Sequence, residues 1–326
     1  MPTIRVIPIG FESLGVRSMC TFVETPDVRV LVDAGVALGL RFGKLPHPKE
    51  YRARNLCRAK IREYAAKADV IVVSHYHNDH HTPNYTETVY VGCSAEESEQ
   101  IYKDKVVLAK DIRNSINFSQ RRRGWMFQQF VKRIGGKVEV ADGKTFEYGA
   151  TKVKVSQPVP HGGEESELGW VVMTTVESQD STFLHASDVQ GPISRPTTRT
   201  ILKEKPDSLI LGGPPIYLEG IKVDKATIRK GLDNAAEIAS KVPMVIFEHH
   251  PLRSEDWRDR AKNVFEVSAE MHHTVTTAAE YAGEQLQLLE AIRPRLYEEE
   301  PPSEAFLKWS KLKREKQRIQ IPPLES

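Results

Sequence analysis

The sequence predicts a layered α/β fold, because strand-like and helix-like segments alternate along most of the chain. The first ninety residues contain four short apolar runs separated by turns, at 3–10, 19–25, 28–35 and 68–74. From Lys205 onward, two further apolar runs each follow a helical segment. Short apolar runs bounded by turn residues are typical of buried strands. Together these observations predict sheets covered by helices.

The middle of the chain predicts a second group of strands. Apolar and polar residues alternate at 105–109, 137–143, 144–159, 168–176 and 181–188, with turn residues between several of these runs. Alternation of this kind is typical of an antiparallel sheet that buries one face.

Helices are expected between and after these strands. Leu56, Ile61 and Tyr64 recur at near-helical spacing within residues 51–68. Residues 111–133 also look helical, and long helices close the chain. The alternation of helices and strands completes the layered α/β pattern.

The composition excludes several classes of protein. Hydrophobic residues make up 40% and charged residues 28%, which is ordinary for a folded domain and argues against disorder. The formal net charge of +2 favours no particular partner. No apolar run reaches the roughly 20 residues needed to span a bilayer, and the first residues lack a signal-peptide pattern. We therefore expect a cytoplasmic protein without a membrane partner.

The three cysteines do not form a metal or redox motif. Cys20, Cys57 and Cys93 lie too far apart for a Cys-x-x-Cys site. We expect them to be buried, reduced thiols.

One segment concentrates ligand-type side chains where a predicted strand ends. His75, His77, Asp79 and His80 follow the apolar run at 68–74. Strand side chains alternate, so His75 and His77 point to the same side, and the turn after them can deliver the other two. Imidazole and carboxylate together suit zinc, iron or manganese, whereas calcium or magnesium would call for more oxygen ligands. Zinc is the first expectation.

This segment resembles the H-x-H-x-D-H signature of the metallo-β-lactamase superfamily, and His75, His77, Asp79 and His80 match the pattern. The resemblance is closest to an archaeal branch known as predicted metal-dependent hydrolases. It implies a four-layer αββα sandwich. It also implies two divalent metal ions, in the first place Zn²⁺, with Mn²⁺ or Fe as alternatives.

The remaining ligands are implied by the same resemblance, in the order in which the family presents them. His161 looks like the third histidine of the first metal, and Asp188 looks like the carboxylate that bridges both metals. The last ligand of the second metal is His249 or His250, and His250 is preferred. Asp33 resembles the aspartate that braces the metal loop without touching metal.

The alternative to metal binding is that these side chains are packed or solvated, as a lone histidine usually is. An ordered series of histidines and aspartates at predicted strand ends makes that alternative weak. Asp79, His81 and His185 are the candidate catalytic side chains. The two histidines lie beside ligands in the sequence, where proton transfer, pocket lining and simple packing all stay open.

The implied activity is hydrolysis. Two metals bridged by Asp188 and a solvent molecule would turn that water into a hydroxide beside the substrate. The β-lactamases of the superfamily commonly carry a cysteine at the bridging position, so antibiotic cleavage is not expected. Phosphodiesters rank first as substrates, because paired metals can bind both nonbridging and leaving oxygens of a phosphate ester. A carboxylic ester, thioester or lactone hydrolase is the alternative, and a di-iron redox or metal-stabilised binding protein is a further alternative.

The candidate substrate-binding residues are Arg121, Arg122 and Tyr217. The arginines lie in a segment rich in arginine and aromatic residues that could grip nucleic acid, although a solvated helix with its aromatics facing the core is preferred. The expected partner is a phosphate ester or nucleotide-type substrate. A nucleic-acid substrate is possible but not required. Hydrolysis of several different substrates and assembly into a homo-oligomer are both left open.

The chain has no repeat at a period of twenty to fifty residues, and its Pro-rich breaks are short. One catalytic domain is therefore expected over residues 1–290. A helical C-terminal extension over residues 291–326 is expected to pack on this domain. Its basic segment 308–320 is expected to dock on the domain or on a second copy rather than to bind RNA.

Overall fold

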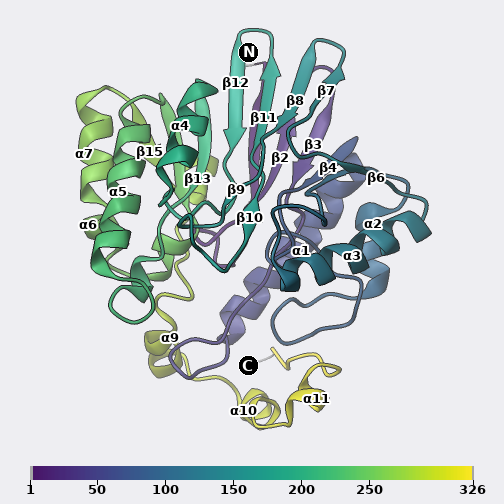
Figure 1. Cartoon of the computed structure of the whole chain (residues 1–326). Helices are drawn as coiled ribbons and strands as arrows, with labels where there is room; N and C mark the ends of the chain where they lie inside the picture. Colours follow the sequence, from purple (N-terminus) through teal and green to yellow (C-terminus); the bar gives the residue numbers. More distant parts are fainter. Residues whose placement is uncertain (1–2, 325–326) are drawn as a thin grey trace.

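Two large β-sheets face each other in the computed structural model, which describes residues 3–324 (Figure 1). The first sheet has six strands in sequence order. Its first two pairings are antiparallel, and the strands from β3 to β6 run parallel. The strands are β1 (Arg5–Gly10), β2 (Cys20–Glu24), β3 (Arg29–Val32), β4 (Val70–Val73), β5 (Val106–Ala109) and β6 (Lys137–Val140).

The second sheet has seven strands in the order β15-β14-β13-β12-β11-β8-β7. The strands from β12 to β15 run parallel, and the other pairings are antiparallel. A separate two-stranded sheet joins β9 (Val159–Pro160) to β10 (Trp170–Val171). The large sheet consists of β7 (Thr145–Tyr148), β8 (Thr151–Val155), β11 (Thr174–Ser178), β12 (Ser181–His185), β13 (Ser208–Gly212), β14 (Met244–Glu248) and β15 (Thr274–Thr276).

Helices cover the outer face of each sheet. Those beside the first sheet are α1 (Pro48–Lys67), α2 (Ala95–Tyr102) and α3 (Phe118–Arg133). Those beside the second sheet are α4 (Arg195–Lys203), α5 (Lys225–Ala239) and α7 (Lys262–Glu270). Shorter helical turns connect them: η1 (Ile216–Leu218), η2 (His250–Arg253), α6 (Trp257–Arg260) and α8 (Ala278–Ala282).

Three buried apolar clusters show that these elements form four layers. One cluster joins the facing sides of the two sheets and includes Val30 and Val72 from the first sheet and Val176 and Phe183 from the second. Leu31 points the other way, into the cluster beneath the helices of the first sheet. Successive strand residues alternate in direction, so a strand buried on both faces serves two clusters. The predicted four-layer αββα sandwich is confirmed.

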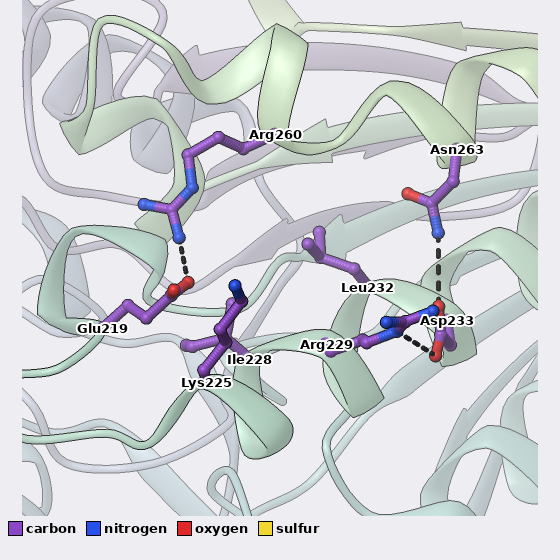
Figure 2. A pocket seen from close by; sticks show the side chains of 8 residues that line it. All are labelled: Glu219, Lys225, Ile228, Arg229, Leu232, Asp233, Arg260 and Asn263. Atoms are coloured by element: carbon purple, nitrogen blue, oxygen red, sulfur yellow. Dashed lines mark hydrogen bonds and ion pairs between the residues drawn. The ribbon is translucent and has the colours of Figure 1, made fainter.

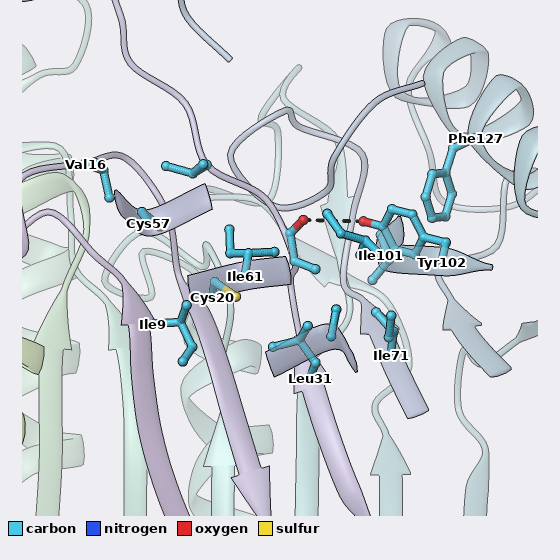
Figure 3. Packing of buried hydrophobic residues seen from close by; sticks show 14 of the residues in the cluster. Ile9, Val16, Cys20, Leu31, Cys57, Ile61, Ile71, Ile101, Tyr102 and Phe127 are labelled. Carbon is cyan, nitrogen blue, oxygen red and sulfur yellow. Dashed lines mark hydrogen bonds between the residues drawn. The ribbon is translucent and has the colours of Figure 1, made fainter. Parts of the chain in front are cut away.

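Two of the apolar clusters lie between helices and a sheet. The one beneath α1, α2 and α3 is the larger of the two. Figure 3 shows Ile61, Tyr102 and Phe127 from these helices packed near Leu31 and Ile71 of the first sheet. All five side chains are buried. On the opposite side of the molecule, a matching cluster joins α4, α5 and α7 to β13 and β14.

Helix α1 differs in detail from the sequence-based expectation. It begins earlier, at Pro48, because a capping box forms between His47 and Glu50. Leu56 does not belong to its buried face, since this side chain is 67% exposed. Five residues separate Leu56 from the buried Ile61, and that spacing turns the two side chains about 140° apart on a helix.

The C-terminal helices α9 (Arg293–Glu299), α10 (Glu304–Ser310) and α11 (Arg314–Gln317) lie beneath the rest of the molecule in Figure 1. The rings of Phe306 and Trp309 each lie 5.8 Å from the ring of Tyr51 in α1. The buried guanidinium of Arg293 donates two hydrogen bonds to Glu50, at 2.8 and 2.7 Å. Aromatic packing and this ion pair therefore hold the C-terminal segment against α1.

Within residues 3–324, none of the helices combines the length and the apolar character that crossing a membrane requires.

Candidate metal centre

The predicted ligands meet at one edge of the two sheets. Parallel strands end at a common edge, and the loops that follow β3, β4, β12 and β14 begin there. These loops carry Asp33, the segment 75–80, Asp188 and the pair His249 and His250. The short strand β9 adds His161 directly after its end.

The first group of donors contains three histidines. His75, His77 and His161 each direct a ring nitrogen to a common point, with these atoms within 4.8 Å of one another. Nδ1 of His77 lies 3.2 Å from Nε2 of His75 and 3.2 Å from Nε2 of His161. Neutral imidazoles at this separation are an arrangement that transition metals and zinc prefer.

A second group lies beside the first and contains Asp79, His80 and His249, whose donor atoms also fall within 4.8 Å of one another. Nε2 of His249 lies 4.0 Å from a carboxylate oxygen of Asp79. His250 is grouped instead with Asp188 and His249. The geometry therefore favours His249 over His250 as the partner of Asp79 and His80, contrary to the preference taken from the sequence.

The carboxylate of Asp188 lies between the two groups. Its Oδ2 is 3.1 Å from Nε2 of His161, which belongs to the first group. The same oxygen is 3.2 Å from Nε2 of His249, which belongs to the second. Nε2 of His250 also lies 3.2 Å from it. One carboxylate thus contacts imidazoles from both groups.

Buried polar atoms without a partner test whether these residues fit metal ions. Among the described residues, Nε2 of His80, Oδ1 of Asp188 and Nδ1 of His250 are buried and form no hydrogen bond. An unpaired buried polar atom is costly, so native structures rarely keep one without another function. Here three of them occur within one cluster of ligand-type side chains. The donor set fits divalent metal ions.

The pKa values of three donor side chains also favour metal binding. Burial, together with neighbouring histidines, holds the pKa of His75 well below its ordinary value. Burial also lowers the pKa of His77 to about 3, and His161 contributes to that shift. Burial opposes ionisation of Asp188, but His161, His250 and His249 outweigh it and hold its pKa well below the usual range. Metals bind neutral imidazole and ionised carboxylate, which are the forms favoured at His75, His77 and Asp188.

Asp33 holds the metal loop from behind. Its carboxylate accepts hydrogen bonds from the backbone N–H of Ser74 at 2.8 Å and from the Ser74 hydroxyl at 2.6 Å. The same carboxylate lies 2.8 Å from Nδ1 of His80, which directs Nε2 of that ring into the centre. Donor atoms of Asp33, His75 and His80 also lie within 4.8 Å of one another, but the contacts just described occupy the Asp33 carboxylate and favour orientation of His80 over binding of an ion.

Glu12 does for His249 what Asp33 does for His80, and no sequence pattern predicted this contact. The Glu12 carboxylate lies 3.0 Å from Nδ1 of His249 and accepts two hydrogen bonds from Arg253, at 2.9 and 2.6 Å. Burial alone would lower the pKa of His249, but the carboxylates of Glu12 and Asp188 outweigh it and raise that pKa well above its ordinary value. Glu12 follows the first strand without a recognisable motif, so only the fold reveals its partner.

Several residues around the centre have left-handed backbone conformations that are unusual outside glycine. The φ angle is 53° at Asp33, 59° at Ser187, 53° at Gln190 and 71° at His249. Such conformations cost free energy and cluster at functional sites, where surrounding contacts maintain them. The concentration of four at this sheet edge marks it as the functional region.

Two predicted catalytic histidines do not face the centre. The ring of His81 packs edge-on against Tyr76 and Phe127, and its Nδ1 lies 2.9 Å from the backbone oxygen of His77. Both nitrogens of His185 contact backbone, at Met19 and Ser187. Neither belongs to a donor group in the described part of the chain. The fold turns both rings into the interior, so of the alternatives left open by the sequence these contacts favour packing.

The three predicted substrate-binding residues lie in different surroundings. The ring of Tyr217 stacks on His250 with centroids 6.1 Å apart, and its hydroxyl accepts a hydrogen bond from Arg253 at 3.2 Å. Arg121 is exposed and donates to the backbone oxygen of Arg113. Arg122 lines a hollow whose wall includes Asn78, inside the metal segment. Tyr217 therefore borders the centre, Arg122 lies at the hollow that Asn78 lines, and Arg121 belongs to neither place.

A separate hollow of about 510 Å³ lies along α5 and is not part of the centre (Figure 2). Two ion pairs occupy its wall, between Arg260 and Glu219 and between Arg229 and Asp233. None of its lining residues belongs to the donor groups. Its charges are largely neutralised within the wall, so it offers a ligand little electrostatic attraction.

Comparison with curated proteins identifies close relatives, although no family model matches the sequence. A UPF0282 protein of Methanopyrus kandleri is 42% identical over 298 residues, covering 91% of this chain and 100% of the relative. A UPF0282 protein of Thermococcus onnurineus is 40% identical over 304 residues, covering 93% and 98%. Another from Methanocaldococcus jannaschii is 39% identical over 305 residues, covering 93% and 100%.

Solved structures are similar at lower identity. The metallo-β-lactamase fold protein YhfI from Bacillus subtilis is 15% identical, covering 80% of this chain and 92% of that one, with a TM-score of 0.48. A possible metal-dependent hydrolase from Veillonella parvula is 11% identical, covering 80% and 94%, with a TM-score of 0.49. CmlA, a diiron β-hydroxylase from Streptomyces venezuelae, is 15% identical, covering 85% and 53%, with a TM-score of 0.48.

The αββα sandwich has the layers of the metallo-β-lactamase fold, and histidine and aspartate donors lie together at its edge. The chain belongs to the UPF0282 family.

Proposed function

We propose that this centre binds two divalent metal ions and that the protein uses them to hydrolyse phosphodiesters. The observation that carries the proposal is the contact of Asp188 with both donor groups. A single carboxylate oxygen lies 3.1 Å from His161 and 3.2 Å from His249. A carboxylate in this position can contact two neighbouring ions, which supports a binuclear centre rather than two independent sites.

The donor groups support one assignment of ligands. His75, His77 and His161 would hold the first ion, and Asp79, His80 and His249 the second, with Asp188 shared between them. Zinc is the first candidate, because imidazoles dominate the donor set; manganese and iron accept the same ligands.

Bound ions of this kind lower the pKa of water to near neutrality and bind oxygens of a phosphate ester. The protein's own residues prepare the site for that chemistry. Asp33 and Glu12 fix the orientation of His80 and His249, so each ring keeps Nε2 directed into the centre. Tyr217 stacks on His250 and forms part of the surroundings that a substrate meets.

The donor set argues against β-lactam cleavage. Asp188, rather than a cysteine, lies between the two groups. Cys20, Cys57 and Cys93 are buried, and none of them belongs to a donor group in the described residues. Burial also raises the pKa of the Cys57 thiol to about 12, so this thiol stays protonated and is a poor metal ligand.

Metal content and substrate class can be measured together. The purified protein would be subjected to elemental analysis and assayed on bis(4-nitrophenyl) phosphate and 4-nitrophenyl acetate, with and without added zinc or manganese. We expect about two ions per chain and metal-dependent hydrolysis of the diester. Metal-dependent hydrolysis of the acetate alone would replace the proposal with a carboxylic ester, thioester or lactone hydrolase. Absence of bound metal under all loading conditions would refute it.

A further inference from the structure

A hollow of about 610 Å³ adjoins the proposed metal centre. Asn78, which lies between His77 and Asp79 in the chain, contributes to its wall. Arg122 of α3 and, from the C-terminal segment, Arg314 and Arg318 also line it. We call this hollow the arginine pocket. The fold thus brings three segments that are distant in the sequence to one surface beside the centre.

The arginine pocket has an excess of positive charge. Arg122, Arg314 and Arg318 are exposed, and within residues 3–324 none of them forms an ion pair. The single acidic residue of the wall, Glu87, is already satisfied by backbone. Its carboxylate accepts hydrogen bonds from the N–H groups of residues 89, 90 and 91, at 3.1, 2.8 and 2.7 Å. The guanidinium groups therefore remain available for an anionic ligand.

Aromatic rings accompany these arginines. Tyr85 and Tyr90 line the same wall, and the guanidinium of Arg314 lies 5.2 Å from the centre of the Tyr90 ring. Tyr85 is 40% exposed, and its hydroxyl accepts a hydrogen bond from Asn78 at 3.3 Å. Arginines beside accessible aromatic rings are typical of surfaces that bind single-stranded nucleic acid, because the arginines contact phosphates and the rings stack on bases.

Buried contacts hold the backbone that carries the two C-terminal arginines. The buried side chain of Gln317 donates hydrogen bonds to the backbone oxygens of Trp309 and Ser310, at 3.2 and 2.8 Å. The hydroxyl of Thr88 lies 2.6 Å from the backbone oxygen of Gln317, and Trp309 donates its ring N–H to Gln320. These contacts connect α11 to the loop that follows the metal motif, so the pocket is preorganised to bind a ligand.

We propose that the arginine pocket binds a phosphate group of the substrate other than the one that is hydrolysed, and that the substrate is a single-stranded nucleic acid. The inference rests on the proposed phosphodiesterase activity and adds a second phosphate contact beside the centre. Asn78 belongs both to the pocket wall and to the metal segment, and this is the observation that connects the pocket with a substrate bound at the centre. A diester with one phosphate would leave the three arginines without a partner.

Binding measurements test this proposal independently of catalysis. Fluorescence anisotropy of the metal-loaded protein would measure the Kd for a labelled oligothymidylate with phosphorothioate linkages, which slow hydrolysis. The Kd of the Arg314→Ala/Arg318→Ala double variant should be at least about tenfold higher, because each substitution removes a charged hydrogen bond to phosphate. Its slope of log K against log salt should also decrease by about 1.4, from about 0.7 for each phosphate contact. Arg122→Ala should weaken binding in the same direction.

Lys316→Ala and Lys132→Ala are the matched controls. Lys316 lies between the two arginines on α11, Lys132 lies on α3 with Arg122, and both are exposed without lining the pocket. These control variants should bind the oligothymidylate with the same Kd as the natural sequence. Thermal unfolding would verify that the double variant is folded. Oligothymidylate binding that does not depend on the three arginines would overturn the proposal.

Different ligands separate the two proposals made for this site. A nucleoside diphosphate that competes as well as the oligonucleotide would indicate a small nucleotide ligand and overturn the nucleic-acid assignment. Arginine-dependent binding without any hydrolysis of phosphodiesters would support the pocket and refute the proposed function. Hydrolysis of bis(4-nitrophenyl) phosphate together with undetectable oligonucleotide binding would support the proposed function and refute the pocket.

Discussion

The carboxylate of Glu12 lies 3.0 Å from Nδ1 of His249, across 237 residues of sequence. Glu12 follows the first strand of one sheet, and His249 follows β14 of the other. Their contact therefore depends on how the two sheets pack. It directs Nε2 of His249 towards Asp79 and Asp188. A buried carboxylate that holds a histidine in this way raises its strength as a ligand.

Glu12→Gln should weaken the second ion without removing the first. The amide keeps the shape of the side chain but loses the charge that supports His249, so we expect a loss of about 10- to 100-fold in affinity for that ion. Titration against a competing chelator would measure it. Glu97→Gln is a suitable control, because it also removes the partner of a buried arginine, Arg58, at a place outside the centre. Equal metal affinity in both variants would contradict the role given to Glu12.

His77→Ala and Asp188→Ala should affect the metal content differently. His77 belongs to the first donor group alone, so its removal should release about one ion and most of the activity. Asp188 contacts both groups, so its removal should reduce the occupancy of both ions. Metal stoichiometry would be measured on each purified variant, with the exposed Asp180→Ala as a control. Full activity of Asp188→Ala would exclude the two-metal mechanism.

Gly35→Ala should disturb the metal loop through contact with its backbone. A Cβ at this position would lie 2.6 Å from the carbonyl carbon of His80 and 2.8 Å from its backbone nitrogen. Backbone atoms cannot rotate away, so we expect a loss of about 1 to 3 kcal/mol in stability and weaker binding of the second ion. Urea unfolding and metal titration would detect both effects.

Gly163→Ala is the matched control for that variant. It follows His161 by two residues, and an added Cβ would meet only Ile193, at an ordinary 3.7 Å. Unchanged stability in Gly35→Ala would mean that the two loops separate more easily than their packing indicates.

Glu290→Gln should make stability less dependent on acid pH. The buried Glu290 accepts two hydrogen bonds of 2.6 Å from Arg17. Burial opposes its ionisation, but Arg17, Arg253 and Arg293 outweigh this and lower its pKa to about 2, from an ordinary value of 4.5. A lowered carboxyl pKa stabilises the folded state above pH 4.5, and this contribution is lost as the pH falls towards 2.

For this reason the variant should unfold about 3 kcal/mol more easily than the natural sequence at pH 7. The difference should shrink by about 2 kcal/mol on going to pH 3. Urea unfolding of the two proteins at pH 7, 5, 4 and 3 would test this. A difference that stays constant across these values would contradict a protonation effect.

The sequence was sufficient for the fold class, because the periodicity of side chains reflects which face of an element is buried. In β3, for example, Leu31 packs under the helices while Val30 and Val32 face the other sheet. A continuous apolar run indicates such a strand without any knowledge of its neighbours. The burial of single residues was predicted less accurately, as the exposed Leu56 demonstrates.

Part of the candidate centre could also be predicted from the sequence. His75, His77, Asp79 and His80 are neighbours along the chain, so a strand end and one turn bring them together. Asp188 follows β12, and parallel topology brings the ends of such strands to the same edge, whereas His161 follows β9 of the separate two-stranded sheet.

The tertiary structure alone decided the contacts that depend on packing between distant segments. His249 and His250 end the same strand, and the left-handed conformation of His249 directs it towards Asp79. The rings of His81 and His185 turn into the interior, although both adjoin ligand residues in the sequence. Sequence periodicity records burial within one element, whereas the partner of a side chain in another element follows from how sheets, loops and the C-terminal helices pack together.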